Sequence, residues 1–129
     1  MNGVDIVEVP RIERISEQYG SRFLDRIYTP LEISYCKGRS QQLASRFAGK
    51  EAMMKALGTG IRGIPWRDIE IVRLRGKPPI IKLHRKAATR AKDLGISSIA
   101  LSLSHSKEYA IASVVCESSN SNTLPTKTK

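Results

Sequence analysis

Three charged side chains occupy positions from which they could handle a phosphate group. Asp5 lies in a short apolar run, and Glu51 and Lys55 lie four residues apart in a longer one. A buried carboxylate is costly unless it is paired or coordinates a cation, so Asp5 and Glu51 could together hold one Mg²⁺. Lys55 and Arg46 could then bind the phosphate charge. The simpler alternative is an i,i+4 ion pair between Glu51 and Lys55, with Asp5 facing solvent or capping a helix.

Ser104, His105 and Ser106 form a second polar cluster. Serine and histidine side by side could indicate nucleophilic catalysis, but the sequence has no G-x-S-x-G elbow and offers no third member of a triad. A serine hydrolase is therefore disfavoured. His105 is either a hydrogen-bond donor to a phosphate or a structural residue of a turn.

A mixed basic and apolar patch is expected near the N-terminus. Such a patch fits an acidic helical protein partner about as well as it fits nucleic acid. A charged face that is simply solvated is the plainest alternative. Its members are Arg11, Arg14, Ile15, Arg22, Phe23 and Arg26.

The elements that would position these residues indicate an α+β fold, with helices early and strands late. The longest helix is expected from about Gln41 to Leu57, because apolar residues recur close to every 3.6 positions and Gly58 suits a left-handed C-terminal cap. Asp5 would lie on a strand. The other helices are expected near 10–18, 22–28, 30–38 (with a Thr29–Glu32 capping box) and 84–94, and the strands near 3–9, 69–74, 80–83, 99–104 and 109–115.

The length of 129 residues predicts one domain, which we place at residues 1–117, followed by a polar tail at 118–129 that we expect to be disordered. No apolar run approaches the length of a membrane span, and the N-terminal residues do not resemble a signal peptide. The two cysteines are too few for a disulfide framework. A reducing cytoplasm is the expected location.

The net charge of +10 is concentrated in one segment. Residues 62–92 contain ten Lys or Arg against Asp68 and Glu70, a net charge of +8. Such a surface attracts polyanions, so a basic, non-enzymatic nucleic-acid-binding domain is one possible function. The aromatic content of 5% and the lack of a base-stacking motif argue against it.

Four blocks of sequence follow one another in a recognisable order and spacing. They are G-V-D-I-V-E at 3–8, R-F-A-G-K-E-A through K-A-L-G-T-G at 46–60, G-K-P at 76–78, and L-S-H-S-K-E-Y-A at 103–110. Together they resemble the holo-[acyl-carrier-protein] synthases, the short bacterial type of 4′-phosphopantetheinyl transferase. The resemblance extends from residue 3 to about residue 117.

This resemblance implies both an activity and an assembly. Members of the family move the phosphopantetheine arm of coenzyme A to a serine of an acidic apo acyl carrier protein, and they release adenosine 3′,5′-bisphosphate. Their subunits are small α+β domains in which a mainly antiparallel sheet packs on a long central helix. They form trimers with active sites at the subunit boundaries.

The resemblance also assigns roles by position. Asp5 and Glu51 match the Mg²⁺ ligands, and Lys55 matches the lysine that faces the transferred phosphate. We interpret Glu51 as the base for the carrier serine, acting directly or through a water on the metal. The N-terminal patch matches the surface that meets the carrier. Arg46 and His105 match contacts to the phosphates of coenzyme A, and Gly76, Lys77 and Pro78 match the lining of its nucleotide end.

Overall fold

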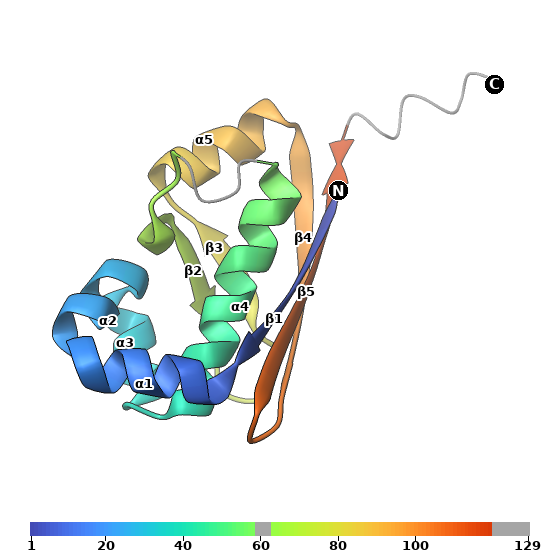
Figure 1. Ribbon diagram of the computed structural model, residues 1–129. Coiled ribbons are helices and arrows are strands. Elements are labelled where there is room, and N and C mark those ends of the chain that lie inside the picture. The colour runs from blue at the N-terminus through green and yellow to red at the C-terminus, as the bar shows by residue number, and fades with distance from the viewer. Residues whose placement is uncertain (59–62, 120–129) are drawn as a thin grey trace.

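The computed structural model describes residues 1–58 and 63–119, so the expected tail beyond residue 119 lies outside this part. Helices dominate the first half of the chain and strands the second, as the sequence predicts (Figure 1). No helix among these residues is long and apolar enough to cross a membrane. The strands are β1 (Asn2–Glu8), β2 (Ile69–Val72), β3 (Ile80–Leu83), β4 (Ile96–His105) and β5 (Tyr109–Ser118), and the helices are α1 (Val9–Tyr19), α2 (Ser21–Ile27), α3 (Pro30–Cys36), α4 (Ser40–Leu57) and α5 (Arg85–Asp93), with a 3₁₀ turn at Trp66–Asp68.

The strands form two separate antiparallel sheets. One has the order β1-β5-β4, and the other pairs β2 with β3. In the three-stranded sheet Asp5 lies opposite Ala112, which in turn lies opposite Leu103. Because side chains alternate between the two faces of a strand, Asp5 shares its face with the fully buried Ala112. This is the face that α4 covers (Figure 1).

Small residues allow α4 to approach its neighbours closely. A methyl group on Gly3 of β1 would lie only 2.0 Å from the carbonyl oxygen of Ala52. On another side of the helix, a methyl group on Gly49 would lie 2.4 Å from Cδ1 of Ile71 on β2. The helix therefore has buried residues on several faces. It ends where the sequence predicts, at Leu57, and is capped by Gly58, whose φ of 75° is left-handed.

The first three helices pack beside α4. α1 follows β1 directly and has Pro10 in its first turn. The predicted capping box is confirmed at α3, where the backbone N–H of Thr29 donates to Glu32 Oε1 (2.8 Å) and the N–H of Glu32 donates to Thr29 Oγ1 (3.3 Å). The first of these bonds brings the Glu32 carboxylate back over the start of α3.

The basic helix α5 is held at both ends. Near its start, the backbone N–H of Lys86 donates to Asp68 Oδ2 (2.9 Å). Further along, Arg90 Nε donates to the carbonyl oxygen of Leu57 at the end of α4 (3.1 Å). Its own residues Ala87 and Ala91 are buried.

The strand ends differ from the predicted ones for local reasons. β2 ends at Val72, two residues early, because Leu74 already belongs to the turn and its carbonyl accepts from the N–H of Lys77 (3.0 Å). β4 begins at Ile96 instead of residue 99, because Ile96 pairs with Ser118 of β5. The sheet therefore includes Ser118, which the sequence analysis placed in the tail.

Candidate active site

Asp5 is brought to α4 by the close approach of β1. Gly3 and Val7 lie on the same face of the strand and are buried, and only 11% of the Asp5 side-chain surface is exposed. The contact between Gly3 and Ala52 brings this strand against the middle of the helix. A carboxylate on this face must therefore find its partners on α4.

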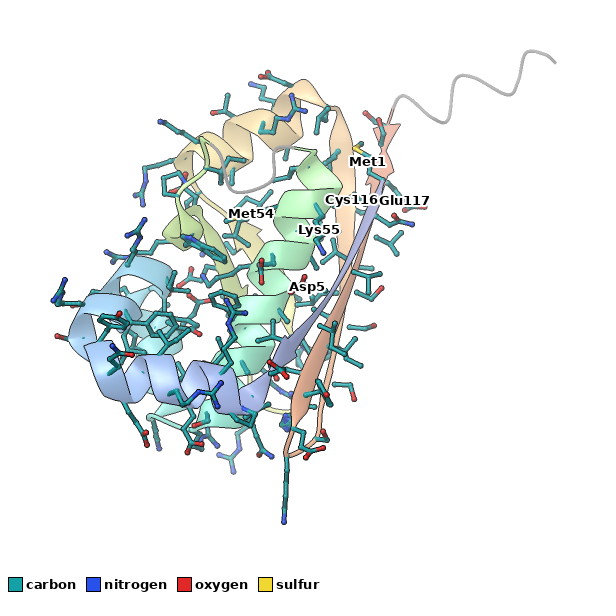
Figure 2. All side chains as sticks on the ribbon, in the orientation of Figure 1. Met1, Asp5, Met54, Lys55, Cys116 and Glu117 are labelled. Atoms are coloured by element: carbon teal, nitrogen blue, oxygen red, sulfur yellow. The ribbon has the colours of Figure 1, made fainter. Side chains whose placement is uncertain are left out.

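Lys55 is one of those partners. Its Nζ lies 2.9 Å from Asp5 Oδ1 and donates to the carbonyl oxygen of Val4 (3.1 Å). The hydrogen bond with Asp5 and the charge of Asp5 raise the pKa of Lys55. Figure 2 shows Asp5 and Lys55 where β1 crosses α4. The simpler alternative, an ion pair between Glu51 and Lys55 within one helix, is therefore wrong: Lys55 pairs across elements with Asp5.

Glu51 lies one turn before Lys55 on the same side of α4. It is half-buried, and its pKa is raised to about 7, first by burial and then by the negative charge of Asp5. The positive charges of Lys55 and Arg11 oppose this rise without cancelling it. Asp5 and Glu51 therefore do converge, as two carboxylates that repel one another.

The donor set suits a hard cation. Asp5 Oδ2 is buried and has no hydrogen-bond partner among the described residues, and the Glu51 carboxylate is destabilised beside it. Oxygen ligands are what Mg²⁺ prefers, and it commonly takes one or two carboxylates and keeps several waters. The described part of the chain contains no group of three or more His, Cys, Asp or Glu that could hold a metal. Asp5 and Glu51 therefore fit such a cation, and their role as its ligands remains a prediction.

Arg46 lies on α4 but away from this cluster. Nine residues separate it from Lys55, which is half a turn around the helix and about 13 Å along it. Its guanidinium lies 4.2 Å from the ring centre of Tyr35, and Nη1 donates to Gln42 Oε1 (2.8 Å). Arg46 is buried, and its Nε has no hydrogen-bond partner in the described parts of the chain. Within one chain, Arg46 therefore lies about half a turn around α4 from Lys55.

The other predicted coenzyme A residues are exposed, one at the end of β4 and three in the turn between β2 and β3. His105 ends β4, opposite Ala110 of β5, on the same face as Asp5 but at the far strand of the sheet. Gly76 has a φ of 75° in the turn that joins β2 to β3. The roles of Arg46, His105, Gly76, Lys77 and Pro78 remain predictions.

Four members of the N-terminal patch gather around one hollow, which we call the α1–α2 groove. It has a volume of about 550 Å³. Phe47 and Trp66 form its floor, with ring centres 4.8 Å apart. Arg11 and Arg14 line a smaller hollow near the start of α1 instead. The members at the groove are Ile15, Arg22, Phe23 and Arg26, joined by Tyr19 and Ile27.

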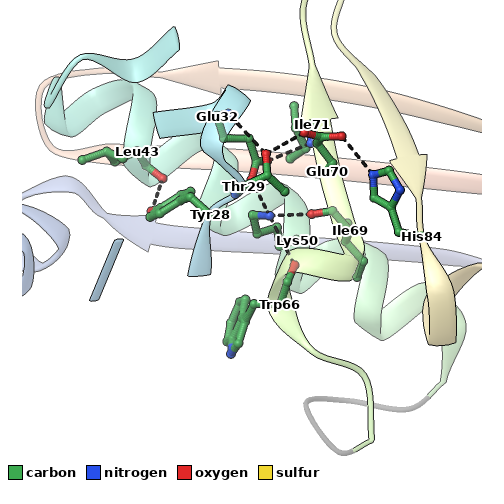
Figure 3. Close-up of polar contacts among 10 residues, drawn as sticks. All are labelled: Tyr28, Thr29, Glu32, Leu43, Lys50, Trp66, Ile69, Glu70, Ile71 and His84. Atoms are coloured by element: carbon green, nitrogen blue, oxygen red, sulfur yellow. Dashed lines mark hydrogen bonds and ion pairs between the residues drawn. The ribbon is translucent and has the colours of Figure 1, made fainter. Parts of the chain in front are cut away.

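A buried charge network next to Glu51 was not predicted from the sequence. Lys50 Nζ lies 2.7 Å from Glu32 Oε1, and both side chains are fully buried (Figure 3). A signal existed, because Lys50 occupies the one gap in the stripe of Leu43, Phe47, Met54 and Leu57 that predicted the helix.

His84, interpreted from sequence as a surface residue, belongs to the same network. Its Nε2 lies 2.9 Å from Glu70 Oε1, and its side chain is one-third exposed. Glu70 in turn accepts a hydrogen bond from Thr29 Oγ1 (2.6 Å), which links it to the capping box of α3. His84 therefore lies partly at the surface, and the Glu70 carboxylate also holds its ring at the start of α5, a contact that the sequence did not indicate.

Known proteins resemble this chain over most of its length. Residues 1–114 match the 4′-phosphopantetheinyl transferase superfamily. The holo-[acyl-carrier-protein] synthase of Koribacter versatilis is 50% identical over 119 residues, which cover 89% of this chain and 95% of that protein. That of Moorella thermoacetica is 46% identical over 120 residues, covering 91% and 93%.

Solved structures of holo-[acyl-carrier-protein] synthases have a similar fold. The crystal structure of Helicobacter pylori holo-[acyl-carrier-protein] synthase in complex with coenzyme A superimposes with a TM-score of 0.83 at 37% identity, covering 91% of this chain and all of that one. The enzyme from Neisseria meningitidis gives a TM-score of 0.80 at 37% identity, covering 90% and 96%. With this fold, and with two carboxylates and a lysine meeting where β1 crosses α4, the chain belongs to the holo-[acyl-carrier-protein] synthases of the 4′-phosphopantetheinyl transferase superfamily.

Proposed function

We propose that this chain transfers the 4′-phosphopantetheine group of coenzyme A to a serine of apo acyl carrier protein and releases adenosine 3′,5′-bisphosphate. Membership of the synthase family supports this activity, and the H. pylori relative was solved with coenzyme A bound. The observation in this chain that carries the proposal is the convergence of Asp5, Glu51 and Lys55. The alternative of a nucleic-acid-binding domain gains no comparable support.

The cluster can perform the proton and charge steps of this reaction. Glu51, half-buried beside Asp5, accepts the proton of the carrier serine, directly or through a water, as the serine oxygen attacks the phosphorus next to pantetheine. The bond from that phosphorus to the bridging oxygen then breaks, and adenosine 3′,5′-bisphosphate leaves. Lys55, half exposed and positively charged, is placed to meet the phosphate oxygens. Mg²⁺ held by Asp5 and Glu51 would neutralise negative charge on the diphosphate when bound.

The proposal includes a homotrimer and a cytoplasmic location. The face of the β1-β5-β4 sheet turned away from α4 carries exposed apolar side chains, including Val4, Ile6, Ile111 and Val115. An exposed apolar face of this kind is typical of an interface between subunits. A trimer could also bring His105 or Arg46 of one subunit toward the cluster of another. Sedimentation equilibrium measures the mass directly, and a monomer at micromolar concentration would contradict the trimer.

Purified apo carrier protein, Mg²⁺ and coenzyme A labelled in its pantetheine arm test the activity. We expect label on the carrier serine and none on a carrier whose serine is replaced by alanine. Chelation of Mg²⁺ should stop the transfer, which tests the metal separately. A folded protein that leaves the carrier unlabelled would contradict the proposal. Thermal stabilisation by an oligonucleotide and not by coenzyme A would favour the nucleic-acid alternative.

A further inference from the structure

A second groove continues the α1–α2 groove toward α5. It consists of two hollows of about 410 and 460 Å³ that share Gly63, Ile64 and Lys86 in their walls, and we call it the α5 groove. The first of these hollows shares Arg26 and Trp66 with the α1–α2 groove. The 3₁₀ turn at Trp66–Asp68 contacts both α2 and α5, so it connects the two regions (Figure 1).

The walls of the α5 groove are strongly basic. Arg26, Arg85, Lys86 and Arg90 line it, whereas Asp93 is the one acidic side chain among its described lining residues. Asp68 lies close by but is fully buried, where it pairs with Arg85 Nε at 3.3 Å. The groove therefore presents an excess of positive charge, and its open shape suits a protein surface better than a small ligand.

The groove is also fixed relative to the catalytic cluster. Arg90 Nε donates to the carbonyl oxygen of Leu57, two residues beyond Lys55 on α4. Asp68 Oδ2 accepts from the N–H of Lys86 and so holds the first turn of α5 against the 3₁₀ turn. A partner that occupies both grooves would be oriented with respect to Lys55 without any movement of the chain.

We propose that the α5 groove is a second docking site for the acidic carrier protein, continuous with the α1–α2 groove. This inference rests on the proposed function, since it assigns a further contact to the same carrier. The apolar floor of Phe47 and Trp66 suits the apolar side of a carrier helix. The basic rim of Lys86 and Arg85 complements acidic side chains farther along the carrier. The α5 contact increases affinity and orients the carrier, while Glu51 and Lys55 perform the chemistry.

Charge reversal at Lys86 tests the proposal. Lys86 is exposed, and a glutamate in the first turn of a helix does not oppose its dipole. Lys92 is the matched control, because it is exposed on the same helix but lines a different hollow. The full chain carrying Lys86→Glu, Lys86→Gln or Lys92→Glu is mixed with fluorescently labelled apo carrier, and the dissociation constant is read from anisotropy. The KM values for carrier and for coenzyme A are measured alongside.

We expect Lys86→Glu to weaken carrier binding about tenfold, Lys86→Gln to weaken it about threefold, and Lys92→Glu to change it less than twofold. The KM for coenzyme A should stay within twofold in every variant. Equal losses for Lys86→Glu and Lys92→Glu would overturn the proposal by showing a non-specific charge effect. A rise in KM for coenzyme A alone would overturn it in favour of a nucleotide site.

Two further outcomes separate this inference from the proposed function. If the unaltered chain transfers phosphopantetheine and Lys86→Glu binds the carrier as tightly as the unaltered chain does, the α5 groove is not a docking site and the proposed activity stands. If the unaltered chain transfers nothing to folded carrier, the proposed function fails and this inference fails with it. An oligonucleotide should not displace labelled carrier at equal concentration, and displacement would mark the groove as a nucleic-acid surface.

Discussion

Lys50 and Glu51 are adjacent in α4, yet they belong to two opposite kinds of charge cluster. Lys50 is fully buried with Glu32, and its Nζ also donates to the carbonyl oxygens of Ile69 and of Trp66, the latter at 3.3 Å (Figure 3). Glu51 lies half-buried beside Asp5, a group of like charge. On one helix, therefore, Lys50 has an oppositely charged partner and hydrogen-bond acceptors, whereas the adjacent Glu51 is repelled by its neighbour Asp5.

Two carboxylates show the consequence. Burial alone would raise the pKa of Glu70, but hydrogen bonds from Thr29 and His84 outweigh it, and the pKa is lowered. At Glu51 burial and the charge of Asp5 act together, and the pKa is raised to about 7. In the buried network, hydrogen bonds favour the charged form of Glu70, although burial lowers the pKa of Lys50 in spite of its pairing with Glu32. In the open cluster of Asp5, Glu51 and Lys55, two carboxylates are kept close together at a cost in stability. A bound cation would relieve that cost.

Replacing Glu51 with Gln tests the open cluster and should have the largest effect. The amide cannot accept the serine proton, so we expect kcat to fall about 1,000-fold, within the range for loss of a general base. Stability at pH 7 should stay the same or rise, because the repulsion from Asp5 disappears. Mass spectrometry of the carrier gives the rate, and urea unfolding gives the stability.

Glu17→Gln is the control for this change, because Glu17 is exposed on α1. It should alter neither the rate nor the unfolding free energy. If Glu51→Gln keeps more than a tenth of the activity, Glu51 is not the base. The open cluster would then differ from the buried network of Lys50 and Glu32 only in its effect on the stability of the fold.

Replacing Lys50 with Met tests the buried network. Removal of one partner from a buried ion pair leaves Glu32 uncompensated, which typically costs about 3–5 kcal/mol. The unfolding free energy from urea titration should fall by that amount, and Glu32→Gln in the same chain should restore part of it. Lys55→Met is the control, and we expect a smaller loss there, since the Lys55 side chain is 54% exposed whereas both partners of the Lys50–Glu32 pair are fully buried. Equal losses at both lysines would erase the distinction between the clusters.

The open cluster was easier to predict from sequence than the buried network. The apolar period located α4 to within one residue at its start, and the motif resemblance placed Asp5 and Glu51 at one site. Nothing in the residue pattern pairs Lys50 with Glu32, because that contact depends on how α3, α4 and β2 pack. The contact between His84 and Glu70 was missed for the same reason, since His84 precedes α5 and Glu70 lies on β2.

The order of the strands in the sheets could not be predicted from the sequence either. Alternating residues predicted most strands, but the pairing of β1 with β5 joins the two ends of the chain. Local patterns carry no information about such distant partners. The separation of Arg46 from Lys55 could have been anticipated from helix geometry alone, whereas the stacking of Arg46 on Tyr35 could not.

Replacing Gly3 with Ala tests how the open cluster is held. The new methyl would lie 2.0 Å from the Ala52 carbonyl oxygen, so β1 must move away from α4. We expect a loss of about 1–3 kcal/mol in unfolding free energy, together with weaker Mg²⁺ binding as Asp5 moves away from Glu51. Calorimetric titration with Mg²⁺ measures the second effect.

Gly49→Ala is the matched control for this substitution. Its methyl would meet side-chain atoms of Ile71 and Leu103 and no backbone, with Cδ1 of Ile71 the nearest, and alanine favours the helix by up to about 1 kcal/mol. Mg²⁺ affinity should therefore be kept in Gly49→Ala and reduced in Gly3→Ala. Unchanged affinity in Gly3→Ala would mean that the close contact of β1 does not position the ligands.

The pH dependence of stability gives the smallest and most specific test. Between pH 4.5 and about 7 the folded chain keeps a proton on Glu51 that the unfolded chain releases, so this group makes the protein less stable as pH rises through that window. A shift of this size corresponds to at most about 3 kcal/mol, and exposure to solvent reduces it to about 1 kcal/mol. In metal-free buffer, the unfolding free energy of Glu51→Gln should therefore rise by about 1 kcal/mol relative to the unaltered chain between pH 5 and pH 7.5.

Glu70→Gln should show the opposite trend, because the pKa of Glu70 is lowered. Its unfolding free energy should lie below that of the unaltered chain at neutral pH, and the difference should shrink as the medium is acidified. Parallel curves for both variants would show that the two carboxylates occupy equivalent environments.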